Sequence, residues 1–375
     1  MTSPRIAVVG AGIGGLAAAI ALRGAGVAVD VFEQAPQFRR IGAAINLTPN
    51  AVKVLRLLGV ADAVAERGYR LAYRSSRHWI DGAETSRLPL GPAAEQRYGA
   101  PQLTAHRADL LGALEAKLPA EAVHLGRRVT GLRQQGEAVE LRFDRGEAYL
   151  ADAVIGADGI HSVVREALFG PEAPRFTGTV AFRAIVSAAP LRRYDLAGFT
   201  KWWGPTPQSQ LVTFLIDRGE NLFLFATRAE TDWQQESWSS AGDVADLRAA
   251  FAGYPDEARA IVGACDVALK TALFERDPLP AWTVGRVTLL GDACHPMMPF
   301  MAQGAAMGLE DAAVLARCLA GASPAGVPAA LRRYEAARRP RTARIQLGSR
   351  ENEWLRTGID ADWVYGYDAA AVPIE

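Results

Sequence analysis

The sequence predicts a mixed α/β fold, in which a Rossmann-like parallel-sheet domain is interleaved with a second, β-rich domain and followed by C-terminal helices. A strand, a glycine-rich turn, a helix and a second strand follow one another at the N-terminus. Alternating β-branched and aromatic runs fill 176–228, and a buried strand returns at 284–291. At roughly 150 residues per domain, 375 residues allow two or three lobes.

Each element is predicted from its apolar pattern. Short apolar runs bounded by turn residues indicate buried strands, and apolar residues at helical spacing indicate helices. In order, we expect a strand at 5–10, a helix at 15–24, a strand at 28–32, helices at 51–68 and 104–118, strands over 123–156 and 176–228, a helical stretch at 243–264, a strand at 284–291, and mostly helix over 304–354.

These elements predict a discontinuous domain organisation. We expect the first domain to consist of 1–70, 100–175 and 275–345, the β-rich domain of 71–99 and 176–274, and a C-terminal helix and tail of 346–375. The turns that end the buried strands then belong to the first domain.

Composition excludes several classes of protein. Lys plus Arg and Asp plus Glu both total 41, so the basic surplus of a nucleic-acid binder is absent. No apolar run reaches the roughly 18–20 residues that span a bilayer, so we expect a cytoplasmic protein without a membrane segment. Three widely spaced cysteines predict no disulfide framework, and the scattered histidines predict no metal site. The basic run 332–344 is expected to be a solvated helix face, with the alternative that one of its arginines guides an anionic substrate. Cys294 is expected to be a buried packing residue.

The strongest local motif is G-x-G-x-x-G, formed by Gly10, Gly12 and Gly15. Gly10 allows the tight strand-to-helix turn, Gly12 lets a pyrophosphate approach the backbone, and Gly15 lets the helix pack closely on the strand. Glu33 ends the next strand about 20 residues on, where a carboxylate accepts ribose hydroxyls. An acidic residue there favours FAD or NAD over NADP.

Two further turns follow buried strands, at the sheet edge where parallel α/β sheets hold their ligands. One contains Asp158, Gly159 and Arg165. The other, "GDACHPMMPFMAQGAAMGLEDA", contains Asp292, whose carboxylate can bind a polyol. Its glycine-rich continuation offers backbone N–H groups at a helix start, which suits a developing anion.

Through these three ordered motifs the chain resembles the FAD-dependent aromatic hydroxylases, which are single-component flavoprotein monooxygenases. Four further stretches support the resemblance: "RRIGAAINLTPNA", "HRADLLGAL", "KWWGP" and "WVYGYD". Within that family the chain looks most like salicylate hydroxylases and 6-hydroxynicotinate 3-monooxygenases. The resemblance implies these FAD contacts: Glu33 at the adenosine ribose, Arg107 at the phosphates, Arg39 or Arg40 near the flavin, Asp292 at the ribityl chain, Pro296, Gly304 and Ala305 beside the isoalloxazine ring, and Asp158 in a turn shared with NAD(P)H.

The resemblance also implies the reaction. NADH or NADPH reduces FAD, oxygen adds at flavin C4a to give a hydroperoxide, and a phenol-like, hydroxypyridine or benzoate-type ring is hydroxylated, with or without loss of a carboxyl group. The choice between NADH and NADPH stays open. We expect a small aromatic substrate, O2 and NAD(P)H as partners, and a monomer or homodimer.

At the expected substrate pocket, the residues of this chain differ from those of the related enzymes. A His of the 6-hydroxynicotinate enzymes falls at Asn46, and the His and Tyr after their "KWW" fall at Gln208 and Val212. Asn46, Trp202, Val212 and Phe214 are the candidate substrate residues, with the alternative that Trp202 and its neighbour Trp203 cover the sheet instead. Pro296 and His295 are the candidate catalytic residues, and no general base stands out.

Three other functions remain in competition. An NAD-dependent dehydrogenase would use only the N-terminal motif, and the two later motifs argue against it. A flavin-dependent halogenase would want a W-x-W-x-I-P stretch, which the chain lacks. A non-catalytic flavoprotein would oxidise NAD(P)H without any response to aromatic compounds.

Overall fold

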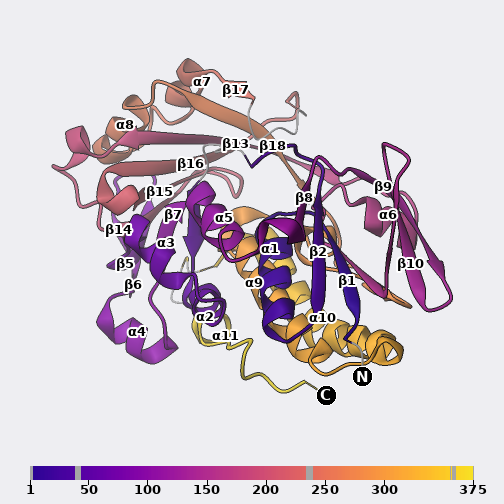
Figure 1. The fold of residues 1–375 in the computed structure, drawn as a ribbon. Helices are drawn as coiled ribbons and strands as arrows, with labels where there is room; N and C mark the ends of the chain where they lie inside the picture. Colours follow the sequence, from indigo (N-terminus) through magenta and orange to yellow (C-terminus); the bar gives the residue numbers. More distant parts are fainter. Residues whose placement is uncertain (1–2, 39–43, 234–239, 355, 357–359, 375) are drawn as a thin grey trace.

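Two large sheets organise the molecule, and helices pack mainly around the first of them (Figure 1). The structure is a computed structural model that describes residues 3–38, 44–233, 240–354, 356 and 360–374. Among the described residues, no helix combines the length and the apolarity needed to cross a bilayer.

The first sheet is six-stranded and mostly parallel. Its order is β19 (Thr283–Val284), β20 (Val287–Leu289), β12 (Ala153–Gly156), β1 (Arg5–Val9), β2 (Ala28–Glu33) and β8 (Val123–Leu125). Val9 is in register with Phe32 on one side and with Gly156 on the other, and Gly156 with Leu289. The turns that follow β1, β2, β12 and β20 therefore meet at one edge of the sheet, which assembles the three sequence motifs.

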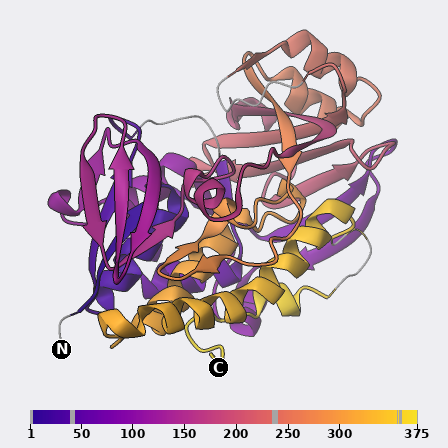
Figure 2. The same cartoon turned by 90° about the vertical axis from the view of Figure 1, so that its right-hand side faces the viewer.

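The helices begin and end as follows: α1 Ile13–Gly24, α2 Pro49–Leu57, α3 Ala61–Arg67, α4 Pro92–Tyr98, α5 Arg107–Glu115, α6 Val163–Phe169, α7 Val244–Ala250, α8 Asp256–Gly263, α9 Gly304–Leu319, α10 Val327–Glu351 and α11 Asp362–Tyr365. Helices α1 and α9 approach each other closely at Gly14 and Gly308. Figure 2 shows α10 as the long helix along the base of the molecule.

The second sheet is eight-stranded. Its order is β17 (Ala241–Gly242), β18 (Ala268–Glu275), β13 (Arg175–Ser187), β16 (Asn221–Ala229), β15 (Gln210–Ile216), β14 (Gly198–Trp203), β5 (Tyr73–His78) and β6 (Glu84–Pro89). Its pairs are antiparallel except β14 with β5. Side chains alternate between the two faces of a strand. One face joins the main core through Phe199, Val212 and Phe214, and the other packs with α7 and α8 through Trp202 and Leu211.

Two three-stranded sheets complete the fold: β3 (Ala44–Leu47), β7 (Leu103–His106) and β4 (Tyr69–Arg70), and β11 (Ala148–Ala151), β10 (Ala138–Phe143) and β9 (Val129–Gln135). Figure 2 shows the second of these at the end of the molecule opposite α7 and α8.

Three predicted elements differ from the observed ones. The helix expected over 51–68 is two helices, α2 and α3, because Gly59 between them adopts a φ of +68° that no α-helix contains. The helix expected over 104–118 begins only at Arg107, after strand β7. The stretch 243–264 is also two helices. Strands of the second sheet come from 73–89 and 175–275, while the predicted domain boundaries themselves stay a prediction.

Candidate active site

A cavity of about 700 Å³ lies between the two large sheets. At one end it is lined by the turns that follow the parallel strands, through Gly12, Asp158 and Asp292. At the other end it is lined by the eight-stranded sheet, through Phe199, Phe214, Phe223 and Phe225 among others. The volume is within the range of small-molecule and cofactor sites.

The glycines of the first turn differ in what surrounds them. Gly10 has a φ of +102°, and a Cβ there would lie 2.4 Å from the Ala157 carbonyl oxygen. A Cβ on Gly15 would lie 1.9 Å from the Gly10 carbonyl oxygen. A Cβ on Gly12 would meet nothing within 4 Å, although Gly12 lines the cavity and caps α1 without a side chain. The space over Gly12 and the exposed helix start therefore fit a pyrophosphate, as FAD requires.

Glu33 is fixed at the end of β2 by the backbone. Its two carboxylate oxygens accept hydrogen bonds from the amides of Ala11 and Ala35, each at 2.8 Å. Both bonds leave acceptor capacity on a carboxylate, since each oxygen carries two lone pairs. The cavity itself is lined by the next residue, Gln34, so Glu33 lies beside the cavity and fits a ribose at its margin.

Two arginines line the cavity, the half-buried Arg107 at the start of α5 and the buried Arg183 on β13. Burial lowers the pKa of Arg107, and the nearby Asp292 carboxylate opposes this. Burial and the charge of Arg107 lower the pKa of Arg183 to about 10. Two cations close together in the cavity wall favour an anionic ligand, and the FAD phosphates are such a ligand.

The two acidic turns are also fixed. Asp158 accepts hydrogen bonds from Ser162 Oγ at 2.6 Å and from the Val164 amide at 3.1 Å, while burial raises its pKa. The side chain of Asp292 is open to the cavity but otherwise surrounded by protein, and this burial raises its pKa against the opposing charges of His295 and Arg107. Arg165 joins the turns by donating to the carbonyl oxygens of Ile160 and Ala293.

His295 lies behind the cavity wall. Its Nε2 is 2.6 Å from Asp311 Oδ2, its ring packs on Trp282, and only 1% of the residue is exposed. The neighbouring Pro296 does line the cavity. The structure therefore does not bring the His295 imidazole to the substrate, and its catalytic role stays a prediction that this placement does not support.

A cluster of Cys294, His295 and Asp311 brings three potential metal ligands within 4.8 Å of one another. The Asp311 oxygens are already used, because Oδ2 accepts from the Gly291 amide and Oδ1 from Arg338 Nε at 2.8 Å. Burial raises the pKa of Cys294 well above its ordinary value, which disfavours the thiolate that a metal needs. This cluster is better explained as packing, and the expected burial of Cys294 is confirmed.

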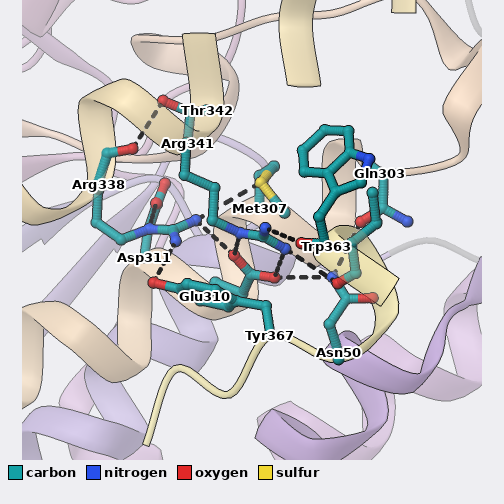
Figure 3. A network of polar contacts seen from close by, with 12 residues as sticks. Asn50, Gln303, Met307, Glu310, Asp311, Arg338, Arg341, Thr342, Trp363 and Tyr367 are labelled. Carbon is teal, nitrogen blue, oxygen red and sulfur yellow. Dashed lines mark hydrogen bonds and ion pairs between the residues drawn. The ribbon is translucent and has the colours of Figure 1, made fainter. Parts of the chain in front are cut away.

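Figure 3 shows the polar network that joins α9 to α10. Arg338 forms ion pairs with Glu310 and Asp311, each at 2.8 Å, and all three side chains are fully buried. Arg341 pairs with Glu310 at 2.8 Å and is 10% exposed. The prediction that 332–344 is a solvated helix face is wrong for these two arginines, because the helical periodicity points them at carboxylates on α9.

The same network holds the start of α9, which lies at the cavity. Asn50 Nδ2 donates to Glu310 Oε1 at 2.7 Å and to Gln303 Oε1 at 2.9 Å, and Gln303 Nε2 donates to Thr48 Oγ1. Gln303 directly precedes Gly304 and Ala305, both of which line the cavity as expected for residues beside a flavin. The backbone there is therefore anchored from behind by buried hydrogen bonds.

The substrate candidates are only partly brought together. Asn46, Val212 and Phe214 line the cavity, but Trp202 packs on the opposite face of the second sheet and is fully buried there. The predicted placement of Trp202 at the ring pocket is therefore wrong. Arg39 and Arg40, the alternatives predicted near the flavin, both lie outside the described residues.

Sequence reasoning missed Lys201 and Gln210, which both line the cavity. The period-two alternation of β14 could have found Lys201, because it shares a face with Phe199 and not with Trp202. Nothing in the sequence alone marked Gln210 as different from its neighbours.

Comparison with known proteins agrees with this architecture. A family model described as FAD binding domain matches residues 4–347. The chain is 42% identical to 6-hydroxynicotinate 3-monooxygenase of Bordetella bronchiseptica, covering 99% of this chain and 97% of that protein. It is 35% identical to salicylate hydroxylase of Pseudomonas putida, covering 92% and 85%. A solved salicylate hydroxylase substrate complex matches with a TM-score of 0.85 at 28% identity, covering 98% and 97%.

The fold and the cavity, with these similarities, define a FAD-dependent flavoprotein monooxygenase. The chain belongs to the FAD binding domain family, whose model covers most of its length.

Proposed function

We propose that this flavoprotein monooxygenase hydroxylates a small aromatic ring that already carries a hydroxyl group, of the hydroxybenzoate or hydroxypyridine class, with NAD(P)H and O2 as co-substrates. The observation that supports this most is the continuous cavity that runs from the glycine-rich turn to an aromatic chamber, the phenylalanine-lined end of the cavity. Relatives named 6-hydroxynicotinate 3-monooxygenase and salicylate hydroxylase act on rings of this class.

Different residues of the chain are assigned to FAD and to the substrate. We propose that Glu33, Arg107 and Asp292 bind the ribose, phosphate and ribityl parts of FAD, and that Pro296, Gly304 and Ala305 contact the flavin ring. FAD, when bound, supplies electron transfer from NAD(P)H and oxygen activation. The phenylalanines of the second sheet would then position the substrate ring and exclude water.

The particular substrate is not carried over from the relatives. Asn46, Gln208 and Val212 stand where the resemblance expects His, His and Tyr of the 6-hydroxynicotinate enzymes. Asn46 and Val212 line the chamber, so the polar groups that would face a substrate differ. We therefore propose the class of substrate and not 6-hydroxynicotinate itself.

We also propose that the enzyme works in the cytoplasm as a monomer or homodimer. The three cysteines are free and buried, which suits a reducing compartment, and NAD(P)H is supplied there.

The test is a visible spectrum of the purified protein, followed by NADH and NADPH oxidation against a panel of hydroxybenzoates and hydroxypyridines. We expect flavin absorption bands, substrate-stimulated oxidation and a hydroxylated product. A Gly12→Val variant is the control, because a side chain over the phosphate space should remove both the flavin and the stimulation. A colourless protein that FAD cannot reconstitute would overturn the proposal.

A further inference from the structure

Lys201 is a buried cationic residue in the wall of the aromatic chamber. It is 1% exposed and lines the cavity from β14. Its Nζ donates a hydrogen bond to Asn352 Oδ1 at 2.7 Å and lies 3.4 Å from the centroid of the Trp203 ring. Phe300, in the turn that follows Pro296, has its ring centroid 5.9 Å from the same nitrogen. Lys201 therefore lies between the substrate chamber and the turn expected to face the flavin.

The charges around Lys201 do not balance an ammonium. Arg74 on β5 and Arg356 both repel an ammonium there, and among the described charged residues Glu353, whose side chain is 55% exposed, provides the opposing attraction. Among the described residues Lys201 forms no ion pair with a carboxylate, and its Nζ donates instead to the neutral Asn352 side chain. A buried ammonium without a carboxylate is costly, and burial lowers the pKa of Lys201 well below its ordinary value. The amine is thus able to accept a proton.

The strand beside Lys201 adds a second polar group. Lys201 is directly opposite Val212 across the β14–β15 pair, and Gln210 is opposite Trp203. Gln210 lines the cavity, is 1% exposed, and its Oε1 has no hydrogen-bond partner among the described residues. A buried acceptor of this kind requires a donor, and a bound ligand with an O–H or N–H group supplies one.

We propose that Lys201 is the general base of the reaction and takes the proton of the substrate's ring hydroxyl. The O–H bond of the substrate breaks and an N–H bond forms on Nζ, so that a neutral amine and a phenol become an ammonium and a phenolate. The ammonium is then stabilised by the phenolate, by Asn352 Oδ1 and by the face of Trp203. The phenolate makes the ring nucleophilic. This assignment rests on the proposed function, because only an aromatic hydroxylase has such a hydroxyl to ionise.

The proposal is tested by binding alone, with the FAD-loaded protein and the chromogenic probes 4-nitrophenol and 4-hydroxy-3-nitrobenzoate. The phenol and phenolate forms of each probe absorb at different wavelengths, so the spectrum reports the ionisation of the bound probe. We expect the wild type to bind phenolate at a pH below the probe's own pKa. Lys201→Met should bind the neutral phenol, with the bound phenolate reduced at least tenfold.

Two further variants separate charge from proton transfer. Lys201→Arg keeps a cation but cannot accept a proton, so its bound probe should titrate with pH, at an apparent pKa that the cation lowers. In the wild type the proton moves within the complex, so the fraction of bound phenolate should not change with pH. Lys53→Met removes a partly buried lysine that donates to the Gly366 carbonyl oxygen and does not line the cavity, so it should behave as the wild type. Lys201→Met replaces the buried amine with an apolar side chain of similar volume, so it should fold and retain FAD. If it does not, Lys201→Gln takes its place.

The result that overturns the proposal is phenolate binding by Lys201→Met equal to the wild type. Neutral phenol bound to the wild type, or no binding of either probe to a wild type that still shows aromatic-stimulated NAD(P)H oxidation, overturns it equally. Each of these results leaves the proposed function standing. Failure of the wild type to bind FAD, in contrast, removes the proposed function itself.

Discussion

At the scale of single residues, the three glycines of the first turn serve different purposes, and substitutions should separate them. Gly12→Val places its side chain in open space, so the protein should fold but lose FAD affinity by more than tenfold. Gly15→Ala drives a Cβ into the Gly10 carbonyl oxygen, so it should lose stability even without FAD. Circular dichroism in denaturant and flavin fluorescence titration distinguish the two. Equal loss of stability in both variants would contradict this division.

Arg107 is expected to lower the stability of the FAD-free protein and to strengthen FAD binding. Burial lowers its pKa, so its charge is disfavoured in the folded protein before an anion arrives. Arg107→Met should therefore raise the thermal midpoint of the FAD-free protein and weaken FAD binding by about tenfold to a hundredfold, the worth of a charged hydrogen bond. Arg67→Met, which removes a 66% exposed arginine, should alter neither. Thermal unfolding scans with and without FAD test both expectations. A lower thermal midpoint of FAD-free Arg107→Met than of the wild type would contradict the expected gain in stability.

At the scale of elements, the contact between α9 and α10 depends on buried ion pairs. Arg338→Met leaves the carboxylates of Glu310 and Asp311 without their shared guanidinium, and should cost about 3–5 kcal/mol of unfolding free energy. Arg339→Met on the same helix removes only a 42% exposed arginine 3.9 Å from Glu335, and should cost about 0–1 kcal/mol. Urea denaturation of both variants gives the comparison. Similar losses would mean that the buried network contributes little.

The same network makes the stability of the folded protein depend on pH. Burial raises the pKa of Asp311, but His295 and Arg338 outweigh burial and leave it below its ordinary value of 3.8. The folded state therefore gains stability from the ionised carboxylate above that value, and loses it as the pH falls toward the lowered one. The stability difference between wild type and Asp311→Asn should be largest near pH 7 and shrink below about pH 4. A difference that does not change with pH would contradict the assignment.

At the scale of the whole molecule, the cavity lies between the two large sheets, so a ligand there contacts both. A ligand that binds only the folded state stabilises it by about 2.7 kcal/mol at a hundred times its Kd. Removal of FAD should therefore lower the thermal midpoint by several degrees, and re-addition should raise it with the logarithm of FAD concentration. Differential scanning calorimetry at several FAD concentrations measures this. Gly12→Val should show no such response.

Much of the cofactor end was predictable from the sequence, because its signals are local. Gly10, Gly12 and Glu33 lie where short apolar strands end, and neighbouring parallel strands bring such ends to one edge. The substrate end was harder. Trp202 and Lys201 are adjacent in the sequence, and only the orientation of β14 between two cores determines which of them reaches the cavity.

The sequence alone determined the mixed α/β class, the glycine-rich turn and the acidic residues that follow the strands, since each depends on a run of neighbouring residues. The tertiary structure alone decided that Arg338 and Arg341 are buried against α9, that His295 lies behind the wall, and that Lys201 and Gln210 line the chamber. Their partners are far away in the chain, so burial and pairing there follow from packing and not from any local pattern.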